Sequence, residues 1–214
     1  MRPSALAAIL ATFAMQAFAA PGVEEAIRPI QDEWARVKYQ VPEKERADRF
    51  HALALEAHRV AEAYPRQAEP RVWEAIVVSS EAGARGGLGA LSMAKEAKRK
   101  LEEALAIDDR ALEGSAYASL GTLYDKVPGW PIGFGDTARA EEYLRRALAI
   151  NPAGIDPNFF YGEYLVGRGR HAEALPRLET ALRAAPRPGR ELADAGRREE
   201  VVALMVRVKK ELAR

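Results

Sequence analysis

The 214-residue chain contains no cysteine. It therefore forms no disulfide, uses no thiolate as a nucleophile or metal ligand, and lacks the lipid-bearing cysteine of a lipoprotein. Histidine is scarce as well, with only His51, His58 and His171. On a helix, His51 and His58 would lie about 10 Å apart by helical rise, which is too far for one metal ion. No metal site is predicted.

An excess of charge of either sign is also lacking. The chain has 32 lysines and arginines against 31 acidic residues, which gives no support for general nucleic-acid binding. No Ser, His and Asp arrangement of a nucleophilic enzyme is recognisable. The glycines between Gly83 and Gly89 lack the Lys-Ser/Thr of a phosphate-binding loop. We therefore expect no catalytic residue and no cofactor.

Long hydrophobic runs are absent except for Ala5–Phe18 at the amino terminus. This run follows Arg2 and is shorter than the about 20 residues of a membrane span. Ala17-Phe18-Ala19 is a small-residue cleavage signal. We expect residues 1–19 to be a cleavable signal peptide. The mature chain would begin at Ala20, would have no stable membrane insertion, and would be periplasmic or secreted.

Alanine, leucine, glutamate and arginine dominate the remainder, a composition that favours helices throughout. The pattern of Gly135 to Pro152 returns 34 residues later in Gly169 to Pro186. Ala140 then corresponds to Ala174. The other corresponding pairs are Leu144 with Leu178 and Ala147 with Ala181. A fixed period of this length is typical of a helical solenoid.

The first helices of the repeats carry a matching pattern. Tyr117, Leu120, Gly121 and Tyr124 fit W-x2-L-G-x2-Y, and Gly162 occupies the glycine position one period later. Both glycines are expected to allow two helices to approach closely. Residues 70–186 therefore resemble three tetratricopeptide repeats, the first of which has Trp73, Ile76, Val77 and Ser80 at these positions.

Helical patterns also flank the repeats. Residues 20–69 are predicted to form a degenerate hairpin of two helices, 23–40 and 43–64. Residues 187–214 are predicted to be a linker and a capping helix, Arg197 to Leu212. The residues of that helix expected to face inward are Val201, Val202, Met205, Val208 and Leu212. The expected fold is all-α: a short right-handed α-α superhelix with a C-terminal cap.

A narrower resemblance rests on YPRQAEP with WEAIVVSSEAGARGGLGAL, on SLGTLYDKVPGWPIGFGD, and on NPAGIDPNFFYGEYLVGRGRHAEAL. These segments resemble exported bacterial repeat proteins akin to the T-component of tripartite ATP-independent periplasmic (TRAP) transporters. The resemblance implies a periplasmic helical protein that associates with a solute-binding subunit.

Two turns are longer than a helical hairpin needs: the glycine-rich residues 82–89 and residues 127–134. Both are expected to emerge at one end of the stack. They could form a binding lip that presents Trp130, Phe134 and the backbone of Gly83 to Gly89. Alternatively, Trp130 and Pro131 could cover the neighbouring hairpin.

The concave face of the stack should be lined by first-helix residues at helical spacing, which form a net acidic set. This favours a protein partner with a basic or amphipathic segment. The alternative is a carrier that holds a small amphipathic ligand beneath the two long turns. The candidate binding residues are Arg71, Glu74, Glu81, Tyr117, Thr122, Asp125, Trp130, Phe134, Asp156, Phe159 and Glu163.

Overall fold

The computed structural model describes residues 22–214, so the predicted signal peptide lies outside the described residues. Within that range every named element is a helix, and none is long and apolar enough to cross a membrane. The helices are α1 (Val23–Gln40), α2 (Glu43–Ala63), α3 (Ala68–Arg85), α4 (Gly87–Ile107), α5 (Ala111–Lys126), α6 (Thr137–Ile150), α7 (Ile155–Gly167), α8 (His171–Arg183) and α9 (Glu191–Leu212).

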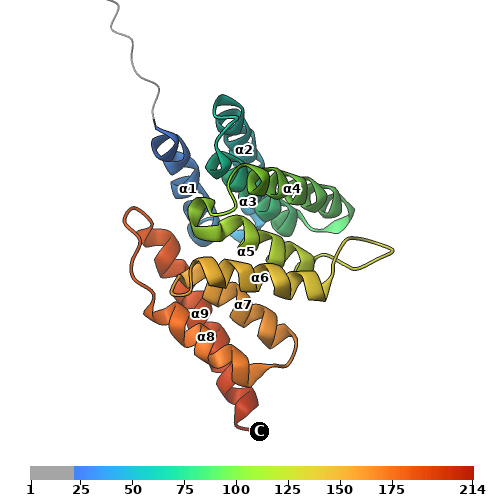
Figure 1. Ribbon diagram of the computed structural model, residues 1–214, viewed down its shortest axis with the longest axis vertical. Helices are drawn as coiled ribbons and strands as arrows, with labels where there is room; N and C mark the ends of the chain where they lie inside the picture. The colour runs from blue at the N-terminus through green and yellow to red at the C-terminus, as the bar shows by residue number, and fades with distance from the viewer. Residues whose placement is uncertain (1–21) are drawn as a thin grey trace, which may run out of the picture.

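The helices pack as consecutive hairpins. α3 packs on α4, α5 on α6 and α7 on α8, and each hairpin rests on the next, so the chain forms a curved stack (Figure 1). α1 and α2 continue it beyond α3. The predicted all-α fold, a tetratricopeptide-like helical solenoid, is confirmed.

Two glycines allow the helices of a hairpin to approach closely, as predicted. A Cβ atom added at Gly121 would lie 2.6 Å from Cγ of Leu144, and one added at Gly162 would lie 2.8 Å from Cδ2 of Leu178. Both leucines are fully buried, together with Ala140 and the other small residues of the repeat pattern. The period-34 positions therefore form the helix contacts of each hairpin.

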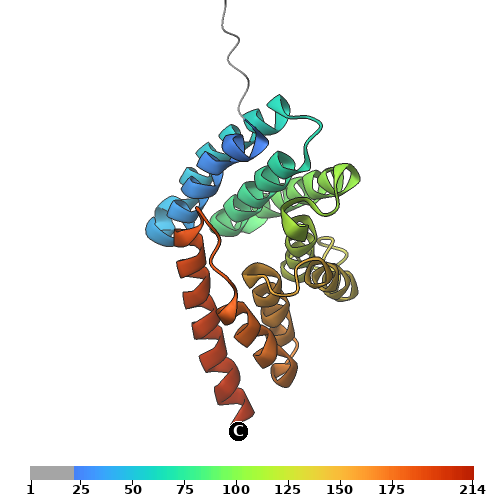
Figure 2. The ribbon, with the colours of Figure 1, turned by 60° about the vertical axis from the view of Figure 1, so that its left-hand side comes forward.

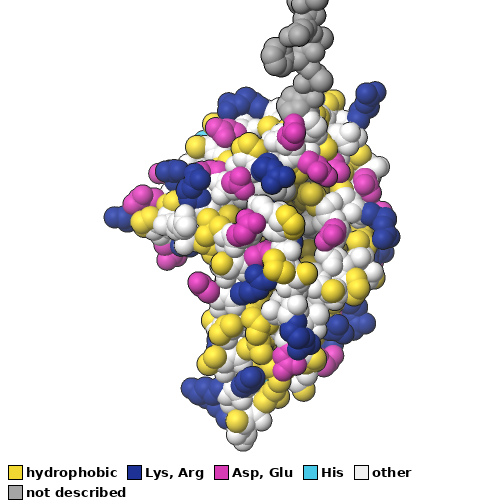
Figure 3. Space-filling model, turned by 90° about the vertical axis from the view of Figure 1, so that its left-hand side faces the viewer, with side chains coloured by type: hydrophobic (Ala, Val, Ile, Leu, Met, Phe, Trp, Pro, Cys, Tyr) yellow, Lys and Arg dark blue, Asp and Glu magenta, His cyan; other side chains and the backbone are white. Residues whose placement is uncertain are grey.

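The inward face predicted for the last helix is mostly correct. Val201 and Val208 of α9 are fully buried, whereas Val202 and Leu212 are both 47% exposed. In α4, Ala97, Leu101 and Ala104 are fully buried, and Ile107 at the helix end is 41% exposed. On the face shown in Figure 3, hydrophobic side chains gather over the lower half, where α8 and α9 lie in Figure 1.

The glycine-rich segment is not the long turn that was predicted. α3 continues to Arg85 and α4 begins at Gly87, so that Gly86 alone connects them. Gly86 and Gly87 have φ values of 63° and 69°, which glycine adopts without strain and which close the reversal tightly. The extra residues therefore lengthen this hairpin and do not form a loop.

The second long turn is a loop, as predicted. It spans residues 127–136 and is held by backbone hydrogen bonds, including Gly135 N–H to the carbonyl of Pro128 at 2.9 Å. Phe134 packs edge-on against Tyr124, with ring centroids 5.4 Å apart. Trp130 is 89% exposed, so it does not cover the neighbouring hairpin. The loop presents this indole to solvent.

The last helix does more than cap the array. α9 packs along α8 and α7 and also contacts α1, so the two ends of the stack meet (Figure 2). The approach is close: a Cβ atom at Gly196 of α9 would lie 2.3 Å from Cδ1 of Tyr39 in α1. The solenoid is thus closed into a ring, which the repeat pattern did not predict.

The glycine contacts generate a test. Gly121→Ala is expected to lower the free energy of unfolding by about 1–2 kcal/mol, because overpacking against Leu144 outweighs the better helix propensity of alanine. Gly83→Ala in α3 is the matched control, since nothing lies within 4 Å of an added Cβ atom. It should stabilise the protein by about 0.5–1 kcal/mol. Urea unfolding measures both, and equal effects of the two substitutions would contradict the close-approach role.

Candidate functional site

A cavity of about 960 Å³, open to solvent on one side, lies at the centre of the ring. Its walls come from α1 to α5, α7, α9, the linker that precedes α9 and the 127–136 loop. Part of the reversal between α3 and α4 also contributes, through Gly83, Ala84 and Gly87. The cavity therefore lies between the two segments that the sequence predicted as a lip, although one of them is helical.

Aromatic side chains form a large part of the wall. Trp34 of α1 meets Trp73 of α3 edge-on, with ring centroids 6.0 Å apart. The position of Trp34 is fixed because its indole N–H donates a hydrogen bond of 2.9 Å to Ser80 Oγ. Phe159 and Phe160 of α7 form a second edge-on pair, at 5.5 Å. These rings are held by their own helices and offer an apolar surface to the cavity.

A network of charged groups joins α7, the linker and α9 at one end of the cavity. Arg197 Nε of α9 donates to Asp156 Oδ1 of α7 at 2.8 Å, and Arg187 Nη1 of the linker donates to Asp156 Oδ2 at 2.7 Å. Arg187 also donates to Asp194 Oδ1, at 2.6 Å from Nη2. Arg197 further donates to Glu200, at 2.6 Å. The guanidinium of Arg197 lies over the rings of both Phe159 and Phe160.

The protonation of Asp156 is set by this network. Burial alone would raise the pKa of Asp156, but the guanidinium groups of Arg197 and Arg187 outweigh it and hold that pKa at about 2. Asp156 is therefore a carboxylate at every physiological pH, and it joins the two arginines to α7. We name this group, Asp156, Arg187, Asp194 and Arg197, the clasp.

Arg190 differs from the arginines of the clasp. Its guanidinium lies over the indole of Trp73, 4.8 Å from the ring centroid, and lines the cavity. Among residues 22–214 no carboxylate lies within ion-pair distance of it. Burial and the neighbouring charge of Arg187 lower the pKa of Arg190. The charges of Asp156, Asp194 and Asp32 act in the opposite direction, but none of these carboxylates pairs with it directly.

The wall beside the loop is more apolar. It includes Leu91 and Ala94 of α4 and Val127, Pro128 and Ile132 of the loop, next to the ion pair of Lys126 and Glu163. In Figure 1 the loop and α9 lie on opposite sides of the stack. The cavity therefore runs from a strongly charged end beside α9 to a more apolar end beside the loop, and this polarity matches an amphipathic molecule.

Four of the candidate residues from the sequence line the cavity: Thr122, Asp156, Phe159 and Glu163. Thr122 donates a hydrogen bond to the carbonyl of Ala118 within its own helix. Glu163 pairs with Lys126 at 3.3 Å. Asp156 and Phe159 belong to the charged end, where both contact Arg197.

Two predicted residues face away from the cavity. Glu74 and Glu81 are 2% and 4% exposed, and they do not lie on an open concave surface. α2 covers that side of α3, so His58 contacts Glu74 at 2.7 Å and His51 contacts Glu81 at 3.1 Å. Lys100 of α4 also donates to Glu74, at 2.7 Å. The placement of Glu74 and Glu81 on an acidic concave face is therefore wrong, because both glutamates are buried and paired between helices.

The other five predicted residues also lie outside the cavity wall. Arg71 contacts Glu103 of α4, and Asp125 pairs with Arg168 at 2.6 Å. Tyr117 is 8% exposed, and its ring stacks on Tyr143. The remaining two are in the loop: Phe134, packed on Tyr124, and the exposed Trp130.

Most of the site residues that sequence reasoning missed come from outside the repeats. Trp34 belongs to α1, Arg190 to the linker, and Arg187 and Arg197 to the clasp, whereas Trp73 and Phe160 lie within the repeats. A signal was available: Arg190 and Arg197 are seven residues apart and so share a helix face. The seven-residue spacing does not show that this face points towards the cavity, because that orientation arises only when the ring closes.

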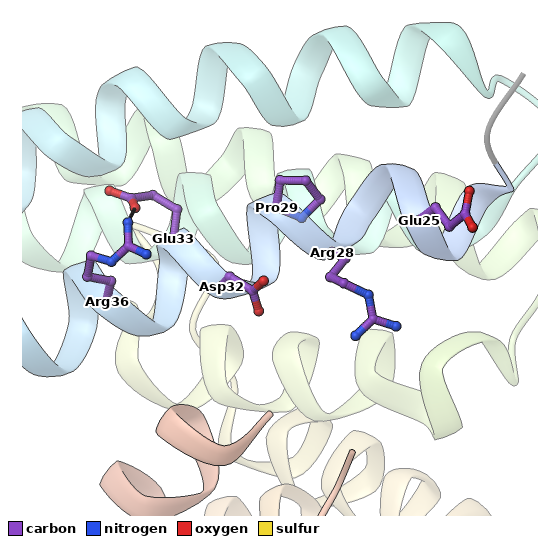
Figure 4. Close-up of a pocket in the computed structure, with 6 residues that line it drawn as sticks. All are labelled: Glu25, Arg28, Pro29, Asp32, Glu33 and Arg36. Atoms are coloured by element: carbon purple, nitrogen blue, oxygen red, sulfur yellow. Dashed lines mark hydrogen bonds and ion pairs between the residues drawn. The ribbon is translucent and has the colours of Figure 1, made fainter. Parts of the chain in front are cut away.

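A second hollow, of about 420 Å³, runs along the outer face of α1 (Figure 4). All its lining residues come from this one helix, and its only internal ion pair joins the exposed Arg36 to Glu33 at 2.6 Å. It gathers no residues from different elements. Within the described part of the chain, no three His, Asp or Glu side chains are grouped as metal ligands.

Comparison with known proteins agrees with the fold. Residues 132–204, from the end of the loop through α6, α7 and α8 into α9, match the model of the family described as tetratricopeptide repeat. No curated protein matches the chain significantly. The match supports a tetratricopeptide-repeat protein, a class of helical scaffold that binds protein partners and is generally not enzymatic.

The clasp generates a test with a defined pH dependence. Asp156→Asn is expected to lower the free energy of unfolding at pH 7 by about 2–4 kcal/mol, since it leaves Arg197 without its main partner. The folded pKa lies below the ordinary value, so this contribution is complete above about pH 4 and is lost as the pH falls towards 2. The stability difference between wild type and variant should shrink in the same interval.

Glu142→Gln serves as the control, because Glu142 forms an exposed pair with Arg146 in α6. Its effect should not exceed about 0.5 kcal/mol. Chemical unfolding at several pH values measures both. If the difference in free energy of unfolding between wild type and Asp156→Asn were the same at every pH, the proposed role of the clasp would be contradicted.

Proposed function

We propose that the protein is a non-enzymatic binding protein that holds a small amphipathic molecule in its central cavity. The cavity itself carries the proposal. Its volume of about 960 Å³ falls within the roughly 300–1,000 Å³ of ligand pockets. Its lining combines aromatic and aliphatic walls with polar and charged side chains, from Lys126 and Glu163 near the loop to Arg190 and Arg197 beside α9.

Several contacts keep the cavity open. Trp34 is tied to Ser80, and Phe159 and Phe160 are covered by Arg197. The clasp holds α9 and the linker to α7, while Tyr39 and Gly196 hold α9 to α1. These contacts hold the wall residues in place, so the aromatic rings do not collapse into the cavity. A pocket formed in advance reduces the ordering cost of binding.

A neutral fluorescent dye tests the cavity directly. N-phenylnaphthylamine should bind wild type with an increase in fluorescence, because its ring system enters an apolar space. Ser119→Trp in α5 places a large side chain in the cavity, since Ser119 lines it and its hydroxyl forms no hydrogen bond within residues 22–214. Dye affinity is expected to fall about tenfold or more in this variant.

The matched control is Ser92→Trp, at an exposed residue of α4 that does not line the cavity. It should bind the dye as wild type does. Both variants are first compared by circular dichroism and thermal melting. If a folded Ser119→Trp variant bound the dye with unchanged affinity, the proposal would be contradicted.

The exposed loop supports a second function, docking to a protein partner. Trp130 and Ile132 are 89% and 68% exposed, on a loop whose backbone is held by its own hydrogen bonds. Solvent-exposed aromatic side chains of this kind are frequent anchors of protein interfaces. We propose that the chain acts outside the cytoplasm after removal of residues 1–19. Its proposed partner there is a solute-binding subunit of a transporter.

Trp130→Ala tests this docking. In cells that export the tagged chain, a solute-binding protein should be recovered with wild type from the periplasmic fraction. Recovery should be lost with the variant, because removing a hot-spot anchor costs about 2 kcal/mol or more. The melting temperature should not change, since the indole makes no packing contact to lose. The recovered chain is expected to begin at Ala20.

Lys44→Ala, at an exposed residue of α2, is the control for a general surface effect. It should leave the recovery unchanged. Equal recovery with Trp130→Ala would exclude the loop as the docking site. Intact mass that includes residues 1–19 would exclude the proposed export.

A further inference from the structure

At the charged end of the cavity, the acids that contact α9 are already paired, whereas Arg190 is not. Asp156 accepts hydrogen bonds from Arg187 and Arg197, and Glu200 accepts one from Arg197 and pairs with Lys38 at 3.3 Å. These acids are therefore already engaged. Arg190 has no carboxylate within ion-pair distance among residues 22–214, although it lines the same space.

The position of Arg190 is held without using its hydrogen-bonding capacity. Its guanidinium carbon lies over the indole of Trp73, 4.8 Å from the ring centroid. The N–H donors lie around the edge of the planar group. Within the described residues, no hydrogen bond from the side chain of Arg190 is formed. A guanidinium with unused donors can bind a carboxylate or a phosphate through two parallel hydrogen bonds.

The electrostatic cost points in the same direction. Partial burial of a guanidinium is unfavourable, and Arg187 beside it adds repulsion. These two effects outweigh the attraction of Asp156, Asp194 and Asp32, so the pKa of Arg190 is lowered. An anion in the cavity would relieve both effects, whereas an uncharged ligand would relieve neither.

We infer that Arg190 binds the anionic headgroup of the cavity's ligand, an amphipathic molecule with a carboxylate or phosphate on an apolar chain. The headgroup lies beside α9 against Arg190, and the chain extends past Phe159 and Phe160 towards Leu91 and Pro128. This inference rests on the proposed function, because it requires a ligand in the cavity. It adds the chemical class of that ligand and the residue that selects it.

Displacement of N-phenylnaphthylamine separates the two proposals. Dodecanoate and dodecyl phosphate supply the two headgroups, and dodecanol supplies the same chain without charge. In wild type, at least one of the anions should displace the dye at a concentration about tenfold lower than dodecanol does. Which anion is stronger identifies the headgroup as a carboxylate or a phosphate.

Arg190→Gln keeps a polar side chain and removes the charge. The dissociation constant of the preferred anion should rise about tenfold, while that of dodecanol stays within about twofold. Arg190→Lys should recover part of the affinity, because it restores the charge but not the planar pair of donors. Arg183→Gln, at an exposed residue outside the cavity wall, is the charge-matched control and should bind as wild type.

Three outcomes would overturn the inference. Dodecanol could compete as well as the anions in wild type, or the preferred anion could bind Arg190→Gln and wild type equally, with both proteins melting alike. Alternatively, the dye could bind while neither anion displaces it. In each case dye binding leaves the cavity proposal standing. Failure of the dye to bind wild type would overturn both proposals together.

Discussion

The salt bridge between Asp156 and Arg197 is the interaction on which the rest of this structure depends. It connects the first turn of α7 to α9, and Arg187 of the linker binds the same carboxylate. Without it, α9 would be an ordinary cap on the last hairpin. With it, α9 is directed back across the array to α1, where Gly196 meets Tyr39. The open stack becomes a ring with a space at its centre.

The fold was predictable because its determinants are local and repeated. Ala140, Leu144 and Gly121 recur with the period and form helix contacts, so their spacing alone indicates a solenoid. The site was predicted only in part, through Asp156 and Phe159. Glu74 and Glu81 were misplaced because spacing does not show which neighbour covers a helix. The sequence pattern does not distinguish the tight reversal at Gly86 from a long loop, because glycine is common in tight reversals and in loops.

The cavity could not be predicted because it is a property of the closed ring. Trp34 and Arg190 are separated by most of the chain and meet around Trp73 only when α1 and α9 come together. Within the described residues, the repeats provide the curvature, and the non-repeating ends add Trp34, Arg190 and Arg197 to the wall. The stack thereby gains a partly open cavity, and Trp130 on its loop stays exposed to solvent. The loop would therefore take part in both proposed functions, because it lines the cavity through Val127, Pro128 and Ile132 and presents Trp130 outward.

A crystal structure of the protein grown with dodecanoate tests the central claim most directly. It should show the alkyl chain inside the ring, between Phe159 and the 127–136 loop, with the carboxylate within hydrogen-bond distance of Arg190. The clasp should be unchanged, because the wall is formed before the ligand enters. An empty or collapsed cavity, with Trp34 and Trp73 turned inward to fill it, would contradict the claim, and so would dodecanoate bound only at the outer surface.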